Sequence, residues 1–290
     1  MGALLIVEQI LNGIQLGVTL FLMAAGLTLI FGIMNMINLA HGSLFTIGAY
    51  LLVTFQKLTG SFVLGLALAV PAAALFGVLL EVVLVRKLYT RDHLDQSLAT
   101  IGLILLFNEG VRFLWGKFPL GVTLPDVLAG SVEIVPGSAY PAFRLLVIAI
   151  GIAVAVGLWL LVAKTRIGML VRAGASDREM TQMLGINVKR LYTIVFALGT
   201  ALAGLAGAMA APIVGVQSGM GDGVLILTLV VIVIGGTGSI RGAFIAALVV
   251  GLFDTFGRVL LPAAVASMAI YILMAAVLVW RPEGLFGVRA

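Results

Sequence analysis

Hydrophobic residues along this chain gather into runs long enough to cross a lipid bilayer, and short polar segments separate the runs. A membrane-spanning helix needs about 20 mainly apolar residues. On that criterion the pattern predicts about eight helices, over residues 5–31, 39–56, 62–86, 96–115, 143–163, 191–214, 224–250 with an interruption, and 263–280. The expected fold is therefore all-α, a polytopic helical membrane protein that forms a single domain over residues 1–290.

The distribution of charge predicts how these helices are oriented. Only 10% of the residues are charged and the mean hydropathy is +1.24, as expected of a membrane protein. Cytoplasmic connections are enriched in Lys and Arg. If residues 164–190 are cytoplasmic, the alternation of spans places residues 86–95, the interruption at Arg241 and the tail from Arg281 on the same side. These regions hold about 12 of the 17 basic residues. The N-terminus is then outside and the C-terminus cytoplasmic, and the net charge of +5 reflects orientation rather than a nucleic-acid partner.

A charged segment at residues 164–190 interrupts the pattern, and we expect it to be a cytoplasmic loop that a soluble partner can contact. Ser176 and Glu179 have the spacing of a capping box, which predicts that a helix begins at Ser176. Gly185 can adopt the left-handed conformation that ends a helix, and Ile186 can then fold back toward Met180. The result is a solvent-facing helix of about two turns. Its apolar side chains share one face and its polar side chains point elsewhere: Met180, Met183 and Leu184 against Asp177, Arg178 and Gln182.

Two polar, glycine-containing stretches interrupt the hydrophobic runs at residues 32–43 and 235–242. Backbone that leaves the helical conformation at membrane depth must be buried in protein or line a watery cavity, but the same residues also suit cytoplasmic turns. Small residues follow both stretches, so a degenerate structural repeat with a substrate path at its interface is a further interpretation. The candidate residues of the translocation path are Asn35, Asn38, His41, Gly42, Ser43, Gly235, Gly236, Thr237, Gly238 and Ser239.

A long connection at residues 116–142 falls on the non-cytoplasmic side of this topology. Its prolines predict a loop with short extended pieces. The loop is either a plain connector or a surface that a partner contacts from outside.

Small residues recur at every fourth position between Gly199 and Ala211. This spacing allows the backbones of membrane helices to approach closely, so we interpret it as a packing surface.

Placing an ionisable residue inside a membrane span costs free energy, so each such residue is treated first as a candidate functional residue. Glu109 with Arg112, and Asp254 with Arg258, have spacings that allow pairing on one helix face, which favours structural ion pairs. Glu81 lies close to Arg86 and is expected to reach the membrane interface. Asp222 follows two glycines and is expected to cap a helix.

Residues for independent chemistry are scarce. The chain has no cysteine, which excludes thiolate catalysis and disulfides, and its two histidines, His41 and His93, belong to no metal or nucleophile motif. We expect His93 to be a surface residue. No phosphate-binding loop is present, so the chain is expected not to be an enzyme, and another chain must bind any nucleotide. The N-terminus lacks the basic region of a cleaved signal peptide.

Four motifs in order support a resemblance to a known family. They are Arg172-Ala-x5-Glu179 continuing through Leu184-Gly185-Ile186, the N-x-x-N-x-A-H-G run from Asn35, the G-G-x-G-S-x-x-G run from Gly235, and W-R-P-x-G-L-F-G from Trp280. Together they resemble the branched-chain amino acid permease family of ATP-binding-cassette importers, which also includes urea and short-amide permeases. The likeness covers nearly the whole chain. The family commonly has alanine at position 180 or 181, where this chain has Met180 and Thr181, and we expect this difference to leave the short helix intact but to alter how it packs on its ATPase.

The resemblance implies the partners and the location. The chain would pair with a homologous permease subunit in a bacterial cytoplasmic (inner) membrane, above two ATPase subunits that bind ATP and Mg, and an extracytoplasmic solute-binding protein would deliver the solute. The coupling residues would be Ser176, Asp177, Arg178, Glu179, Met180, Met183, Leu184, Gly185 and Ile186. Branched-chain or other hydrophobic amino acids are the first expectation for the solute and urea or a short amide the second. An autonomous ion-coupled transporter or channel is the alternative from another class.

Overall fold

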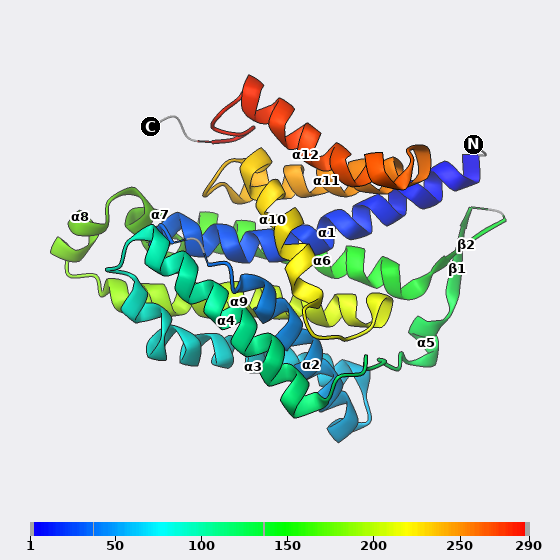
Figure 1. Cartoon of the computed structure of the whole chain (residues 1–290), viewed down its shortest axis with the longest axis horizontal. Helices are drawn as coiled ribbons and strands as arrows, with labels where there is room; N and C mark the ends of the chain where they lie inside the picture. The colour runs from blue at the N-terminus through cyan, green and yellow to red at the C-terminus, as the bar shows by residue number, and fades with distance from the viewer. Residues whose placement is uncertain (1–2, 37, 136, 288–290) are drawn as a thin grey trace.

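The computed structural model describes residues 3–36, 38–135 and 137–287, which form a helical protein with one small β-hairpin (Figure 1). The bounds of the longer helices are α1 Ala3–Met34, α2 His41–Thr59, α3 Phe62–Val83, α4 His93–Trp115, α6 Ala142–Lys164, α9 Val188–Val214, α10 Met220–Gly235, α11 Ile240–Leu260 and α12 Ala263–Trp280. Helices α1, α6, α9 and α11 lie roughly along the long axis of the molecule, whereas α10 crosses it (Figure 1). The shorter elements are η1 Val85–Leu88, α5 Asp126–Ala129, β1 Ser131–Val135, β2 Ser138–Pro141, α7 Arg166–Ser176 and α8 Arg178–Met183.

Every predicted hydrophobic run forms a helix, but the run at 224–250 forms two. It is divided at Gly236–Ser239, where Gly236 and Gly238 have φ angles of 93° and 82° that end α10 and prevent it from continuing into α11. By length and hydropathy, six helices in the described part of the chain can cross a bilayer, namely α1, α3, α4, α6, α9 and α11. Helices α10 and α12 are also apolar but shorter.

Helix α9 lies at the centre of the bundle, packed against α1, α2 and α3. Its small residues allow this. A methyl group added at Gly204 would lie 2.6 Å from the Cβ atom of Ala73 on α3, and one added at Gly199 would lie 3.0 Å from the Gly26 carbonyl oxygen on α1. On α2, Gly48 directly faces Gly204. The packing surface predicted between Gly199 and Ala211 is confirmed.

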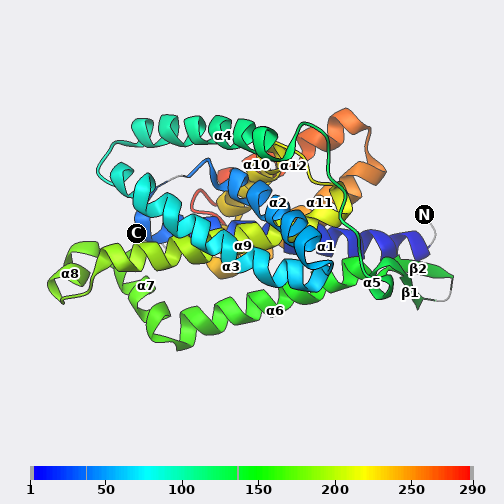
Figure 2. The same ribbon diagram turned by 90° about the horizontal axis from the view of Figure 1, so that it is seen from below.

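Helices α4 and α6 lie along opposite edges of the bundle in Figure 2. The start of α1 and the β1–β2 hairpin are at one end of the long axis, and α7 and α8 are at the other end (Figures 1 and 2). Within the connection 116–142, the predicted extended pieces are the antiparallel strands of this hairpin. Tyr140 donates a hydrogen bond of 3.0 Å to the Asn12 side chain, which holds the hairpin against α1.

Candidate functional site

The short helix α8 is the outermost element at its end of the molecule (Figure 1). Asp177 is its N-cap, and its side chain accepts a hydrogen bond of 2.9 Å from the Met180 amide. The prediction that the helix begins at Ser176 is wrong, because α7 continues through Ser176 and the chain turns to an extended conformation only at Asp177. Ser176 and Glu179 therefore do not form a capping box.

The end of α8 agrees with the prediction. Gly185 has a φ angle of 81°, its amide donates to the Gln182 carbonyl at 2.9 Å, and the Ile186 amide returns to the Thr181 carbonyl at 3.3 Å. This is the Schellman pattern, which uses a left-handed glycine to satisfy the last carbonyls of a helix. Caps at both ends thus define an element of six residues.

The apolar side chains of α8 and its C-cap face away from the protein. The exposed fractions of Met180, Met183 and Leu184 are 54%, 81% and 72%, whereas Thr181 on the other side is 2% exposed and faces inward. Exposed apolar side chains on an otherwise polar element indicate a contact surface for another protein. We call these three residues the docking face.

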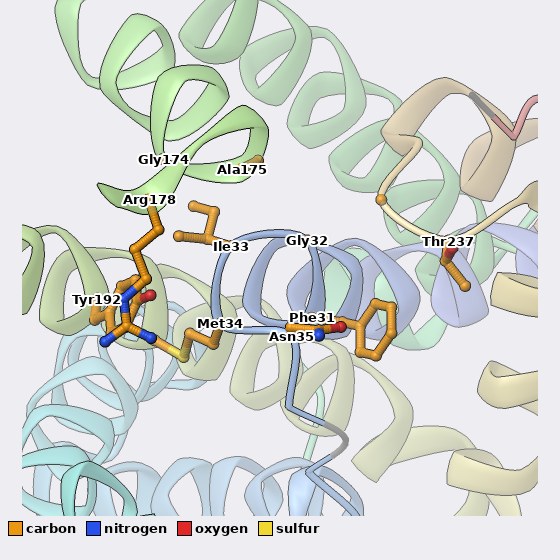
Figure 3. A pocket seen from close by; sticks show the side chains of 11 residues that line it. Phe31, Gly32, Ile33, Met34, Asn35, Gly174, Ala175, Arg178, Tyr192 and Thr237 are labelled. Atoms are coloured by element: carbon orange, nitrogen blue, oxygen red, sulfur yellow. The ribbon is translucent and has the colours of Figure 1, made fainter. Parts of the chain in front are cut away.

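A pocket of about 600 Å³ lies beneath α8 (Figure 3). It brings together the two polar interruptions of the sequence, with Asn35 from the first and Thr237 and Gly238 from the second. Asn35 is the non-glycine residue with positive φ in the described chain, at 49°, a conformation that asparagine tolerates. Arg178 of α8 and Tyr192 of α9 line the same pocket. The short helix and both interruptions therefore meet at one point.

A chain of side-chain contacts leads from α8 into the bundle. Figure 3 shows Arg178 beside Tyr192, and its guanidinium lies 5.1 Å from the centre of that ring. The Tyr192 ring meets Tyr89 edge to face at a centroid distance of 5.1 Å. Tyr89 in turn donates a hydrogen bond of 2.9 Å to the Glu81 carboxylate. These contacts link α8, α9, the connection after η1, and α3.

The Glu81 carboxylate is fully buried where this chain of contacts ends. It accepts two hydrogen bonds from Arg86, at 3.1 and 2.8 Å, and one of 2.9 Å from the Thr193 hydroxyl on α9. The expectation that Glu81 reaches the membrane interface is wrong, because these donors satisfy the charge inside the protein. Burial, together with the neighbouring Glu81 charge, raises the pKa of Tyr89, so its hydroxyl remains protonated and able to donate.

The remaining candidates of the first interruption lie away from the pocket. Asn38 is buried, and its side-chain oxygen accepts a hydrogen bond of 3.1 Å from the Ala40 amide at the start of α2. His41 and Ser43 are buried in the first turn of α2, with the His41 ring against Gly26 of α1. Gly42 packs on Gly221, whose amide donates to the Thr46 hydroxyl at 3.1 Å, so α2 and α10 meet at their N-terminal ends.

The second interruption is covered by the C-terminal segment. The amides of Leu285 and Phe286 donate to the carbonyls of Ile234 and Gly235 at 2.8 and 3.1 Å. A side chain at Gly236 would collide with the backbone of Gly287, 2.5 Å away. Ser239 caps α11 by accepting a hydrogen bond of 3.0 Å from the Gly242 amide. The glycine motif and the C-terminal motif, distant in sequence, thus form one structural unit.

Three further acidic residues, Glu109, Asp222 and Asp254, have structural partners. Arg112 pairs with Glu109 at 2.6 Å and Arg258 with Asp254 at 2.8 Å, as predicted. Asp222 does not cap a helix. It lies in the first turn of α10, whose N-cap is Gly219, and its carboxylate accepts a hydrogen bond of 3.2 Å from Asn108 on α4. His93 is exposed at the start of α4, as expected.

Sequence reasoning did not identify Tyr89, Tyr192 or Thr193. Isolated tyrosines and threonines near helix ends carry no motif, and the contacts that join them to Glu81 and Arg178 cross more than one helix. Among the described residues, no group of His, Cys, Asp and Glu is arranged to hold a metal ion.

Comparison with known proteins identifies relatives over nearly the full length. The family model described as "Branched-chain amino acid transport system / permease component" matches residues 9–278. The high-affinity branched-chain amino acid transport system permease protein BraD of Pseudomonas aeruginosa is 30% identical, with 97% of this chain and 95% of the relative covered. LivH of Escherichia coli strain K12, another such permease protein, is 28% identical with the same coverage.

A more distant relative belongs to a different transport system. The ribose import permease protein RbsC of Escherichia coli strain K12 is 25% identical over 80% of this chain and 72% of the relative. No solved structure matches the chain. With the family model covering most of the sequence, this chain belongs to the family of branched-chain amino acid transport system permease components.

Proposed function

We propose that this chain is the transmembrane permease subunit of an ATP-driven importer for branched-chain and other hydrophobic amino acids. The observation that carries the proposal is the docking face of Met180, Met183 and Leu184, exposed on a helix that is capped at both ends. A small apolar face on a short helix suits a groove on a partner protein. The partner would be an ATPase subunit, one of two beneath the membrane.

The contacts behind the docking face support a coupling role for α8. When the ATPases close on ATP, a rigid-body shift of α8 would act on Tyr192 through Arg178, and on Tyr89 and Glu81 through Tyr192. Arg178 also borders the pocket that Asn35 and Thr237 line. The same shift would therefore reach both interruptions, which we propose belong to the inner end of the translocation path.

We further propose that α8 faces the cytoplasm of a bacterial cell, with the N-terminus outside and the C-terminus inside. In this orientation the connections near Arg86, Arg172, Arg241 and Arg281 are cytoplasmic, in agreement with the preference of basic residues for that side. The β1–β2 hairpin would face outward, toward a solute-binding protein. A homologous permease subunit would complete the translocation path.

Support for the solute comes from the relatives BraD and LivH, both named for branched-chain amino acid transport. Three acidic residues of the membrane-range helices, Glu81, Glu109 and Asp254, are each paired with an arginine, which suits a solute without net charge. Branched-chain amino acids at neutral pH are zwitterions of this kind.

The test is reconstitution in proteoliposomes of this chain with a homologous permease subunit, two ATPase subunits and the solute-binding protein of the same transport system. We expect uptake of radiolabelled leucine that requires ATP and every component, with isoleucine and valine competing. Competition by urea or acetamide instead would contradict the proposed solute. Gradient-driven uptake by this chain alone would contradict the importer class.

A further inference from the structure

A second cavity, of about 880 Å³, lies on the side of α1 between α6 and α11. Both helices pack against α1, which runs between them in Figure 1. The cavity's floor includes Phe21 of α1, whose ring meets Phe244 of α11 edge to face at 5.0 Å. Large apolar side chains form its walls, among them Ile152, Val156 and Trp159 of α6 and Ile245 of α11. We call this cavity the α6–α11 groove.

One end of the α6–α11 groove is basic. Arg172 of α7 and Arg241 at the start of α11 line it there, and both residues are exposed. The Arg172 guanidinium donates to the Val162 carbonyl, which leaves most of its five N–H donors free. None of the ion pairs among the described residues involves Arg172 or Arg241, and no acidic residue lines the groove.

This arrangement has the polarity of a phospholipid. An apolar slot at the depth of the membrane-spanning helices can hold an acyl chain, and two arginines at its end can hold a phosphate through paired N–H donors. Basic pockets between membrane helices are a known way of binding anionic head groups. Trp159 in the wall is the kind of side chain that favours the boundary between acyl chains and head groups.

From the charge complementarity and the apolar walls, we propose that the α6–α11 groove binds an anionic phospholipid, with Arg172 and Arg241 on its phosphate. A helix of another subunit is a poorer match. Interfaces between membrane helices are enriched in small residues that allow close approach, as on α9, whereas this groove is walled mainly by large side chains.

The lipid would lie next to the pocket beneath α8. Gly238 lines both the groove and the pocket beneath α8, and Ser239 and Ile240 line the groove beside it. The Ser239 oxygen accepts the capping hydrogen bond of α11, so its hydroxyl proton is free to donate to a phosphate oxygen. A bound head group would thereby steady the connection between α10 and α11.

Native mass spectrometry of the purified chain tests the proposal, with titration of phosphatidylglycerol and, separately, phosphatidylcholine. The double variant Arg172→Gln/Arg241→Gln should bind phosphatidylglycerol roughly 10- to 30-fold more weakly, the effect expected of two basic residues near a head group. The matched control is Lys87→Gln/Arg91→Gln, which removes two exposed basic residues outside the groove. It should lower binding less than twofold, and binding of phosphatidylcholine should be weak and equal in all three proteins.

A photo-crosslinking amino acid in place of Ile245 identifies the occupant in the assembled complex. A lipid adduct supports the proposal, whereas a crosslink to the second permease subunit would overturn it. An equal loss of phosphatidylglycerol binding in the two double variants would also overturn the proposal, because the effect would then come from overall charge. Neither readout depends on transport, so the proposal can fail while the importer function stands.

Discussion

At the scale of single residues, the buried Glu81 carboxylate is the group behind α8 that most needs hydrogen-bond donors. Its oxygens accept hydrogen bonds from Arg86, Tyr89 and Thr193, which come from the chain after α3 and from α9. A buried charge is tolerated only when donors satisfy it in this way. Glu81 therefore fixes the ends of α3 and α9 relative to each other.

Replacement of Glu81 by glutamine should destabilise the protein by about 2 kcal/mol, since it weakens hydrogen bonds made to a charged group. Thermal unfolding in detergent would measure this as a lower Tm. Glu109→Gln is the matched control, because Glu109 is also paired with an arginine but its side chain is 70% exposed. Exposed ion pairs contribute little to the free energy of unfolding, so the control variant should have the same Tm as the wild-type protein. Equal Tm values for the two variants would contradict a buried network at Glu81.

Substitutions of Tyr192 test the contact between α8 and the bundle. Tyr192→Leu removes the ring that meets Arg178 and Tyr89, and uptake per ATP hydrolysed should fall roughly two- to fivefold, in line with the strength of a cation–π contact. Tyr192→Phe keeps the ring and should behave as wild type. Uptake per ATP hydrolysed would be measured for both variants in proteoliposomes. A loss in the phenylalanine variant equal to that in the leucine variant would assign the effect to the hydroxyl group rather than to the ring.

At the scale of elements, α8 shows which boundaries the sequence can predict. Its end follows from Gly185, because the left-handed conformation is a local property of that residue. Its start depends on which of two adjacent capping residues, Ser176 or Asp177, is used. The packing of α7 decides this, since Gly174 contacts Leu191 of α9 and α7 extends through Ser176. Tertiary contacts of this kind are not visible in a sequence pattern.

Gly185 should be the position of α8 most sensitive to substitution. No atom lies within 4 Å of an added Cβ there, so valine would be strained by its backbone conformation alone, at a φ angle of 81°. We expect Gly185→Val to distort the end of α8 and uncouple ATP hydrolysis from uptake without affecting membrane insertion. Gly185→Asn is the control, because asparagine tolerates this conformation. Normal coupling in the valine variant would refute a coupling role for α8.

Substitution of Glu179 is a separate test of the docking face. It is exposed in the first turn of α8 and is not needed for the cap, which Asp177 provides. Glu179→Lys should reduce coupling several-fold by reversing a charge beside the docking face, while Glu179→Gln should reduce it less. Uptake and ATP hydrolysis measured together would show this. Equal, normal coupling in both variants would place Glu179 outside the contact with the ATPase.

At the scale of the whole molecule, glycines determine how closely the helices pack. The sequence predicted the packing surface of α9 from its spacing, but not which helices it meets. Gly199 faces Gly26 of α1 and Gly204 faces Gly48 of α2, partners more than 150 residues away in the chain. Because α9 also carries Tyr192 at the end near α8, a movement transmitted through Tyr192 would be passed to α1, α2 and α3 together.

A pair of alanine substitutions tests this close packing. A Cβ atom at Gly48 would overlap the backbone of Gly204, so Gly48→Ala must push α2 and α9 apart, at a cost of about 1–3 kcal/mol. Gly102→Ala, in α4, is the matched control: it is the same substitution in a membrane-range helix, and no atom lies within 4 Å of the added Cβ. It should be neutral, or stabilising by up to about 1 kcal/mol. Tm in detergent should therefore fall by several degrees for Gly48→Ala only, and an unchanged Tm in that variant would mean that α2 and α9 do not pack closely at this point.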